Sequence, residues 1–218
     1  MTTENLNQEE FEAHAKSGTL RIAFVGMSNA GKSYRSRILR DEQNFFWYDV
    51  DGEIQKDLGF EEMSDISSWL GYPNTETYPE REASYLATEA KNTKIDFLET
   101  NGENLVFDTT GSVIYLDSET RNWLINACLV VNLDVGDDAI ENMLQRFIKE
   151  PKPVIWNGFF VAEEGETNIE TIRRCYPKLL ADRLARYRSL AHITIPAEAL
   201  YDRDGTGTLR IIKSYLPQ

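Results

Sequence analysis

Residues 26 to 33 are the stretch of this sequence with the clearest chemical meaning. Gly26 and Gly31-Lys32-Ser33 stand at the spacing G-x-x-x-x-G-K-S that phosphate-binding loops require. Glycines allow the backbone to curl until successive N–H groups point at one anion. The Lys32 ammonium would then reach the terminal phosphates of a nucleotide, and the Ser33 hydroxyl would hold Mg²⁺. We assign nucleotide binding to Gly26, Asn29, Ala30, Gly31, Lys32, Ser33 and Tyr34.

The flanks of this loop decide between a phosphate site and an ordinary glycine turn. An apolar run, Leu20–Val25, precedes the loop and predicts a strand, and a helix-compatible run, Tyr34–Arg40, follows it. A phosphate-binding loop needs this strand–loop–helix setting, and the N-terminus of the helix would add partial positive charge. A turn that binds nothing is therefore the weaker interpretation.

Aspartates follow the next predicted strands, where a carboxylate would face the phosphate site. Asp49 and Asp51 lie at the end of the run Phe45–Val50, and Asp108 follows Leu105–Phe107. In Asp-x-Asp the two side chains leave a strand on the same face, so both could reach one ligand. Such carboxylates can hold Mg²⁺ or accept a proton from an attacking hydroxyl, although Asp is also common as a helix cap or turn residue. We expect Ser33, Asp49 and Asp108 to be the metal ligands, and Lys32, Asp49, Asp51 and Asp108 to be the catalytic residues.

The overall charge narrows the classes of ligand. The 218 residues include 23 Lys and Arg against 36 Asp and Glu, a net charge of −13. Nucleic-acid binders need a basic surface that releases counterions, so this balance disfavours a nucleic-acid partner and suits a small anionic ligand. The plain alternative is that the charge serves solubility.

Further features predict a cytoplasmic protein with no membrane partner. No run reaches the ~18 apolar residues that cross a bilayer. The N-terminus lacks the basic start and apolar core of a signal peptide. Two cysteines, Cys128 and Cys175, form no disulfide framework and have no metal-ligand spacing.

Apolar runs alternate with helix-like segments along most of the chain. The strand candidates are Leu20–Val25, Phe45–Val50, Leu105–Phe107, Ala127–Leu133 and His192–Ile195. The helix candidates are Lys32–Arg40, Pro79–Thr100, Ser118–Asn126, Asp137–Lys149 and Thr167–Ala191. Strands that alternate with helices predict an α/β fold with a parallel sheet. Ligands of such sheets bind beyond the carboxyl ends of the strands, where the phosphate loop already lies.

Two segments fall outside this alternation. Residues 1–18 are polar and acidic and would form one short helix or a frayed extension, so we expect the domain proper over residues 19–218. Residues 150–165 contain prolines that forbid a regular helix, yet they also carry Trp156, Phe159 and Phe160. A long connection with its own aromatic side chains is often a lid, and we place a lid at about residues 150–170. A packed surface excursion and a partner-binding patch are the alternatives.

The motifs together resemble those of the shikimate kinase group of small-molecule kinases, within the nucleoside-monophosphate-kinase-like fold. Asp49-Val50-Asp51-Gly52-Glu53-Ile54 resembles the Asp-Thr-Asp-x-x-Ile segment of that family. Lys152-Pro153-Val154 stands where the family has Arg-Pro-Leu, and Arg146 stands where it has a nucleotide-side arginine. The run Arg183–Ile195 resembles the family's last helix and strand, so the resemblance covers most of residues 20–196.

This resemblance implies a three-layer α/β/α P-loop NTPase fold with a five-stranded parallel sheet, a substrate-binding helical segment at about residues 52–100, and a lid. It implies ATP and Mg²⁺ as cofactors and a small-molecule hydroxyl as phosphoryl acceptor. By position, Asp49 would support Mg²⁺ and the reacting hydroxyl, and Asp51 would bind substrate hydroxyls. Arg183 would bind a substrate anion, whereas Arg146 and Lys152 would contact the nucleotide.

Three departures from the family pattern bear on the ligands. Gly111 stands alone in Thr109-Thr110-Gly111-Ser112, where the family has three consecutive glycines. Tyr85-Leu86 replaces a Phe-Arg pair, which leaves Arg81 as the nearby arginine that could grip a substrate anion. Lys152 replaces an arginine and lacks its bidentate fork. The expected substrate contacts are Asp51, Arg81, Gly111 and Arg183, but these changes should alter which molecule fits.

Two functions from different classes compete. The first is an ATP- and Mg²⁺-dependent kinase for a small hydroxyl-bearing molecule, active as a monomer or homodimer. The second is a nucleotide-binding switch or assembly module with little transfer activity, with the lid aromatics as its partner surface. A kinase for the 5′-hydroxyl of nucleic acid is a weaker third candidate because the chain is so acidic. The absence of an Asn-Lys-x-Asp guanine-reading motif favours ATP.

Overall fold

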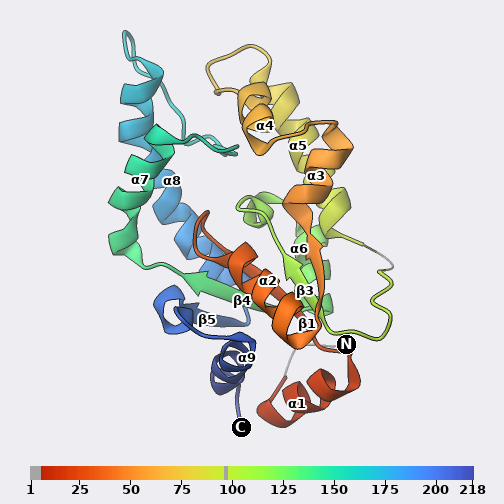
Figure 1. Ribbon diagram of the computed structural model, residues 1–218. Helices are drawn as coiled ribbons and strands as arrows, with labels where there is room; N and C mark the ends of the chain where they lie inside the picture. Colours follow the sequence, from red (N-terminus) through yellow and green to blue (C-terminus); the bar gives the residue numbers. More distant parts are fainter. Residues whose placement is uncertain (1–5, 96–97) are drawn as a thin grey trace.

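The fold is built on one sheet of five parallel strands in the order β2-β3-β1-β4-β5 (Figure 1). The computed structural model describes residues 6–95 and 98–218. The strands are β1 (Arg21–Gly26), β2 (Phe46–Asp49), β3 (Leu105–Asp108), β4 (Leu129–Asp134) and β5 (Ile193–Pro196). Every neighbouring pair is parallel, so each connection must cross over through an intervening segment. The predicted α/β fold with a five-stranded parallel sheet is confirmed.

Helices cover both faces of this sheet. They are α1 (Gln8–Ser17), α2 (Lys32–Gln43), α3 (Val50–Leu58), α4 (Met63–Leu70), α5 (Tyr78–Thr93), α6 (Ser118–Ala127), α7 (Ile140–Lys149), α8 (Asn168–Leu190) and α9 (Gly205–Ser214), with 3₁₀ turns η1 (Val113–Tyr115), η2 (Asp137–Ala139) and η3 (Ala197–Leu200). Helix α2 packs on β1, β2 and β3, whereas α6 and α8 pack on β4. The run Ile22–Val25 of the central strand is fully buried, which requires cover on both faces because successive strand side chains point in opposite directions.

Two helical arms rise beyond the carboxyl edge of the sheet (Figure 1). One arm consists of α3, α4 and α5. The other consists of α7 and the N-terminal half of α8, joined by residues 150–167. Because ligands of parallel sheets bind at this edge, the arms frame the expected site.

Element boundaries differ in places from the sequence-based expectation, notably at the end of α5 and after β2. The helix expected over Pro79–Thr100 ends at Thr93, and residues 96–97 of that expectation lie outside the described residues. Strand β2 ends at Asp49 and α3 begins directly after it, so the expectation that Asp49 and Asp51 leave one strand on the same face is wrong. The reason is local: the Asp49 carboxylate accepts a hydrogen bond from the Gly52 N–H (3.3 Å) and caps α3.

The first described helix packs against the last helix of the chain. A reciprocal capping box between Asn7 and Glu10 starts α1, and Phe11 of that helix is buried. The Gln8 N–H donates to the Pro217 carbonyl oxygen (2.9 Å), and α1 contacts α9. The N-terminal segment therefore forms the short helix of the two alternatives. Helix α9, on which it packs, was not predicted.

Candidate active site

The loop between β1 and α2 has a curled backbone. Gly26, Asn29 and Gly31 have positive φ values of 141°, 66° and 94°. At Gly26 a Cβ atom would lie 2.7 Å from the Leu133 carbonyl oxygen of β4, so glycine is required there. Helix α2 begins at Lys32, which places its free N–H groups at the loop. This is the backbone that an anion site needs.

Lys32 is buried inside this loop. Its ammonium nitrogen donates to the carbonyl oxygens of Gly26 (3.0 Å) and Met27 (3.2 Å). Burial lowers the pKa of Lys32, while the carboxylates of Asp108 and Asp51 act in the opposite direction. An ammonium group held at this position is suited to bind phosphate oxygens.

A cleft of about 970 Å³ opens beside the loop. It brings together most of the predicted site residues, namely Asn29, Gly31, Lys32, Ser33, Tyr34, Asp51, Gly111, Arg146, Lys152 and Arg183. Five predicted residues do not line it, namely Gly26, Ala30, Asp49, Asp108 and Arg81. The first four lie within the loop or at strand ends beside it, whereas Arg81 belongs to α5.

Asp49 and Asp108 end neighbouring strands at the same level. The register pairs Asp49 of β2 with Asp108 of β3. Asp108 is only 3% exposed, and its Oδ2 atom has no hydrogen-bond partner in the described part of the chain. Burial raises the pKa of Asp108, and the Lys32 ammonium and the Ser33 hydroxyl oppose this shift.

This donor set fits Mg²⁺. Within residues 6–95 and 98–218, no three His, Cys, Asp or Glu side chains are arranged to hold a metal by themselves. Mg²⁺ does not need such a cage, because it commonly binds through one or two carboxylates together with phosphate oxygens and water. The unpartnered Oδ2 atom of Asp108, near the Ser33 hydroxyl, is an oxygen ligand of this kind.

Asp51 faces the cleft from the first turn of α3. Burial raises the pKa of Asp51 to about 6, and the Lys32 ammonium is the largest opposing influence. A carboxylate with this pKa is ionised at neutral pH and still basic enough to accept a proton. Helix α3, and not a strand, places Asp51 at the cleft. Asp49 does not line the cleft and caps this helix.

Arg183 and Gly111 both line the cleft and lie close together. The Arg183 Nη2 atom donates to the Ile155 carbonyl oxygen (2.8 Å), and its guanidinium lies 5.4 Å from the Tyr115 ring centre. A Cβ atom on Gly111 would lie 3.4 Å from Arg183 Nη1. The Tyr187 hydroxyl donates to the Gly111 carbonyl oxygen (2.5 Å), which fixes this loop. Two of the four expected substrate contacts are thus neighbours.

Arg81 is placed differently from the other expected substrate contacts. Its guanidinium donates to the Trp69 carbonyl oxygen and lies over the Trp69 ring, 5.9 Å from the ring centre. It ties α5 to α4 and does not line the cleft.

Glu89 is a buried acid that sequence reasoning missed. It has no exposed surface, and its two carboxyl oxygens accept hydrogen bonds from the hydroxyls of Thr110 and Ser112. Burial raises the pKa of Glu89 to about 7, and the Ser112 and Thr110 hydrogen bonds oppose this shift. The sequence did contain a signal for the position of Glu89. It lies four residues after Tyr85, so the two side chains share one face of α5.

Solved structures share this arrangement of elements. No family model matches the chain, and no curated protein matches its sequence. A shikimate kinase from Acinetobacter baumannii, in complex with shikimate, matches with a TM-score of 0.53 and 24% identity, over 94% of this chain and 96% of that one. The chain has the fold of a shikimate kinase. Shikimate kinases from Bacteroides thetaiotaomicron (TM-score 0.54, 18% identity, 89% of this chain and 97% of that one) and Aquifex aeolicus (0.53, 21%, 88% and 93%) agree.

On this shikimate kinase fold, the segment expected to be a lid is anchored by aromatic packing. Trp156 and Phe160 are buried and pack against each other with ring centres 4.9 Å apart. Trp156 also packs edge-on against Phe147 of α7. The exposed Lys152 donates to the Asn29 Oδ1 atom of the phosphate loop (3.2 Å). Burial of Trp156 and Phe160 removes two of the three aromatic side chains on which the alternative of a partner-binding patch depends, and Phe159 is half-buried.

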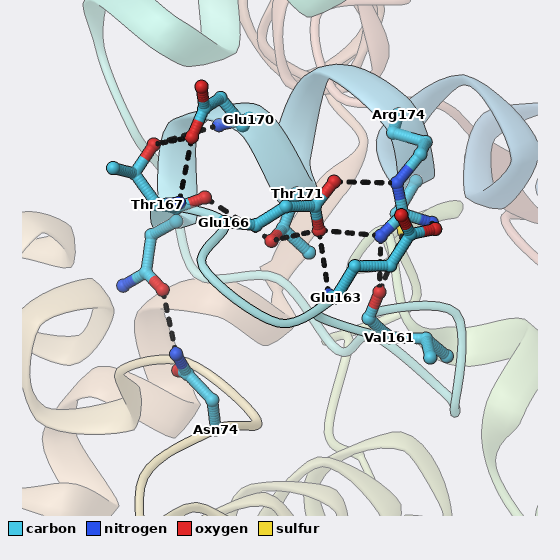
Figure 2. A network of polar contacts seen from close by, with 10 residues as sticks. Asn74, Val161, Glu163, Glu166, Thr167, Glu170, Thr171 and Arg174 are labelled. Atoms are coloured by element: carbon cyan, nitrogen blue, oxygen red, sulfur yellow. Dashed lines mark hydrogen bonds and ion pairs between the residues drawn. The ribbon is translucent and has the colours of Figure 1, made fainter.

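The outer end of this segment is held by a polar network, shown in Figure 2. Arg174 of α8 pairs with Glu163 (3.3 Å) and Glu166 (2.6 Å), and the Thr167 hydroxyl caps α8. The Asn74 Nδ2 atom donates to the Asn168 Oδ1 atom (2.8 Å). Because these two asparagines come from opposite sides of the cleft, this contact bridges the arms.

Among the helices that the structure describes, none has both the length and the apolar character that crossing a bilayer would demand.

Proposed function

We propose that this protein transfers the γ-phosphoryl group of ATP, with Mg²⁺, to a hydroxyl of a small molecule. The observation that carries the proposal is a single cleft that holds Lys32 and Ser33 of the phosphate loop together with Asp51 and Arg183. The fold shared with shikimate kinases supports the same reaction class. Residues at about 52–100 would hold the acceptor, and those at about 150–170 would act as the lid.

The reaction needs one bond to form and one to break. The acceptor oxygen bonds to the γ-phosphorus, the bond from that phosphorus to the β,γ-bridging oxygen breaks, and ADP leaves with the electron pair. The hydroxyl proton passes to the Asp51 carboxylate, whose pKa of about 6 allows it to act as base at neutral pH.

The remaining groups position the phosphates. Lys32 contacts the terminal phosphates, and Arg146 and Lys152 close over the nucleotide from α7 and the lid. Ser33 and Asp108, with Asp49 beside them, would hold Mg²⁺, which neutralises charge on the phosphate oxygens when bound. The Lys152 contact with Asn29 supports a lid that reaches the phosphate loop.

Replacing Lys32 by Met tests the proposal. Loss of this cation should lower kcat for ADP release by about 100- to 1000-fold, because the transferred charge loses its main fixed partner. Lys178→Met on the exposed side of α8 is the matched control and should retain activity. Thermal melting shows whether each variant is folded. Full ATP-dependent activity in a folded Lys32→Met protein would refute the proposal.

A further inference from the structure

Two neighbouring strands each carry a buried polar atom that has no hydrogen-bond partner in residues 6–95 and 98–218. One is the indole nitrogen Nε1 of Trp47 on β2, which can only donate, and the other is Oδ2 of Asp108 on β3, which accepts when the carboxyl group is ionised. A buried donor without a partner is costly to the folded state. The proposed kinase function uses the Asp108 carboxylate but gives no role to the indole N–H.

The sheet places these two side chains on the same face. Strands β2 and β3 are parallel neighbours, and their register pairs Trp47 with Val106 and Asp49 with Asp108. Paired residues share a face of the sheet, and so do residues two apart along one strand. Trp47 and Asp108 are therefore diagonal neighbours on one face, a separation that an aromatic side chain can span.

Helix α2 covers the Trp47 ring from outside. The Arg40 guanidinium of this helix lies over the indole, 4.9 Å from the ring centre, and α2 contacts both β2 and β3. An aromatic ring attracts a cation to its negative face and presents a positive edge. The face of the indole thus meets a cation, while the buried N–H at its edge is suited to an anion.

Asp108 is the anion on which this N–H acts. Burial raises the pKa of Asp108, and three donors oppose the shift, namely the Lys32 ammonium, the Ser33 hydroxyl and the Trp47 N–H. A carboxylate has about four lone-pair positions, so it can accept from an N–H and still bind a metal. The Ser36 hydroxyl of α2 is also buried without a partner among the described residues, but an N–H bonds more strongly to a carboxylate than to a hydroxyl.

We propose that the Trp47 indole N–H is a positioning donor that holds the Asp108 carboxylate in place to bind Mg²⁺. This inference rests on the proposed kinase function and adds a residue to its metal site. Trp47 contacts neither the metal nor the substrate, and it acts through Asp108. Replacing a residue that supports a metal ligand in this way typically lowers metal affinity about 10- to 100-fold.

Replacing Trp47 by Phe tests the inference, because it removes the N–H and keeps an aromatic ring. Calorimetric titration with the ATP analogue AMPPNP, in Mg²⁺ and in a chelator, gives the factor by which Mg²⁺ increases nucleotide affinity. Trp47→Phe should lower this factor about tenfold and change the affinity in chelator by less than about twofold. Trp123→Phe is the matched control, since Trp123 is also partly buried but packs on Phe107, which points to the opposite face of β3.

A double-mutant cycle tests whether Trp47 acts through Asp108. Asp108→Asn alone should lower the same Mg²⁺ factor, because it removes the charged ligand. Adding Trp47→Phe to Asp108→Asn should then change the factor by less than about twofold, since the carboxylate that the N–H positions is already gone. Ser36→Ala should leave the factor unchanged. Trp47→Leu also lacks the N–H and should repeat the loss seen in Trp47→Phe.

The outcomes separate this inference from the proposed function. Melting temperature in chelator verifies that each variant is folded. An unchanged Mg²⁺ factor in Trp47→Phe, an equal loss of affinity with and without Mg²⁺, or additive effects in the double variant would overturn the inference. So would the same loss in Trp123→Phe or Ser36→Ala, or a wild-type affinity that does not depend on Mg²⁺. Failure of the wild-type protein to bind AMPPNP at all would instead overturn the proposed function.

Discussion

The environment of Glu89 gives one residue a measurable effect on the whole protein. Its pKa rises from an ordinary 4.5 to about 7, with burial as the largest cause. Between these two values the folded protein binds more protons at this site than the unfolded chain does. The sign follows: the contribution of Glu89 to stability is full below about pH 4.5 and is lost as the pH rises through about 7.

Glu89→Gln should remove this pH dependence, because glutamine does not titrate. Between about pH 4.5 and pH 7 the free energy of unfolding of the wild-type protein should fall by about 3 kcal/mol relative to that of the variant. This figure follows from the rise of the Glu89 pKa from 4.5 to about 7 at 1.36 kcal/mol per pKa unit. Urea unfolding of both proteins across this range measures the difference. Glu80→Gln, exposed on the same helix, should run parallel to the wild type. Parallel curves for Glu89→Gln would contradict the prediction.

Single residues differed in how far the sequence could predict them. Lys32 and Ser33 lie in a local motif, so their place in the cleft followed from spacing alone. Glu89 is buried by hydroxyls about twenty residues further along the chain, and no local pattern reports such a partner. Asp51 lies in the cleft as expected, but on a helix and not at the end of a strand. The Asp49 side chain caps that helix, and such local capping competes with continuation of the strand.

At the scale of elements, the segment after α7 is held by a tyrosine from the opposite arm. The Tyr78 hydroxyl accepts a hydrogen bond from the Trp156 N–H (3.1 Å) and donates to the Glu82 carboxylate (2.7 Å). Both Tyr78 and Trp156 are buried. The first turn of α5 is thus coupled to the base of the expected lid, and movement of residues near Lys152 would hinge beyond this anchor.

Tyr78→Phe should leave the backbone N–H of Trp156 buried without a partner. An unsatisfied buried donor costs about 1–3 kcal/mol, so the free energy of unfolding should fall by that amount. Urea denaturation measures it, with Tyr201→Phe as control because Tyr201 is 63% exposed. An unchanged unfolding midpoint for Tyr78→Phe would show that the anchor carries no energy.

Elements with strong periodicity were predictable, and those fixed by distant contacts were not. The five strands are apolar runs, and each was placed to within about two residues. Helix α9 begins with Gly205 and contains Gly207, and glycines at this spacing indicate a loop in the sequence. It forms because Asp204 caps it and its buried Ile212 packs into the core. Tertiary burial overrode weak local propensity there.

At the scale of the whole molecule, a single sheet carries two arms that contact each other at the buried Tyr78–Trp156 anchor and at the exposed Asn74–Asn168 pair. The contact between Lys152 and Asn29, which joins the expected lid to the phosphate loop, is exposed. Exposed polar pairs contribute little to stability. A ligand that contacts both arms and the phosphate loop would add further interactions, and its binding energy would appear as stability of the folded chain.

Nucleotide with Mg²⁺ should therefore raise the melting temperature. At a ligand concentration one hundred times Kd the stabilisation is about 2.7 kcal/mol, and for a chain of this size each kcal/mol shifts Tm by about 2–4 °C, giving about 5–10 °C in total. A chelator should reduce the shift, because Ser33 and Asp108 would then lack the ion that joins them to the phosphates. Asp108→Asn should reduce it in the same way, whereas Asp138→Asn, on the outer turn η2, should leave it intact. No shift at saturating nucleotide would mean that the loop at residues 26–33 does not hold a triphosphate.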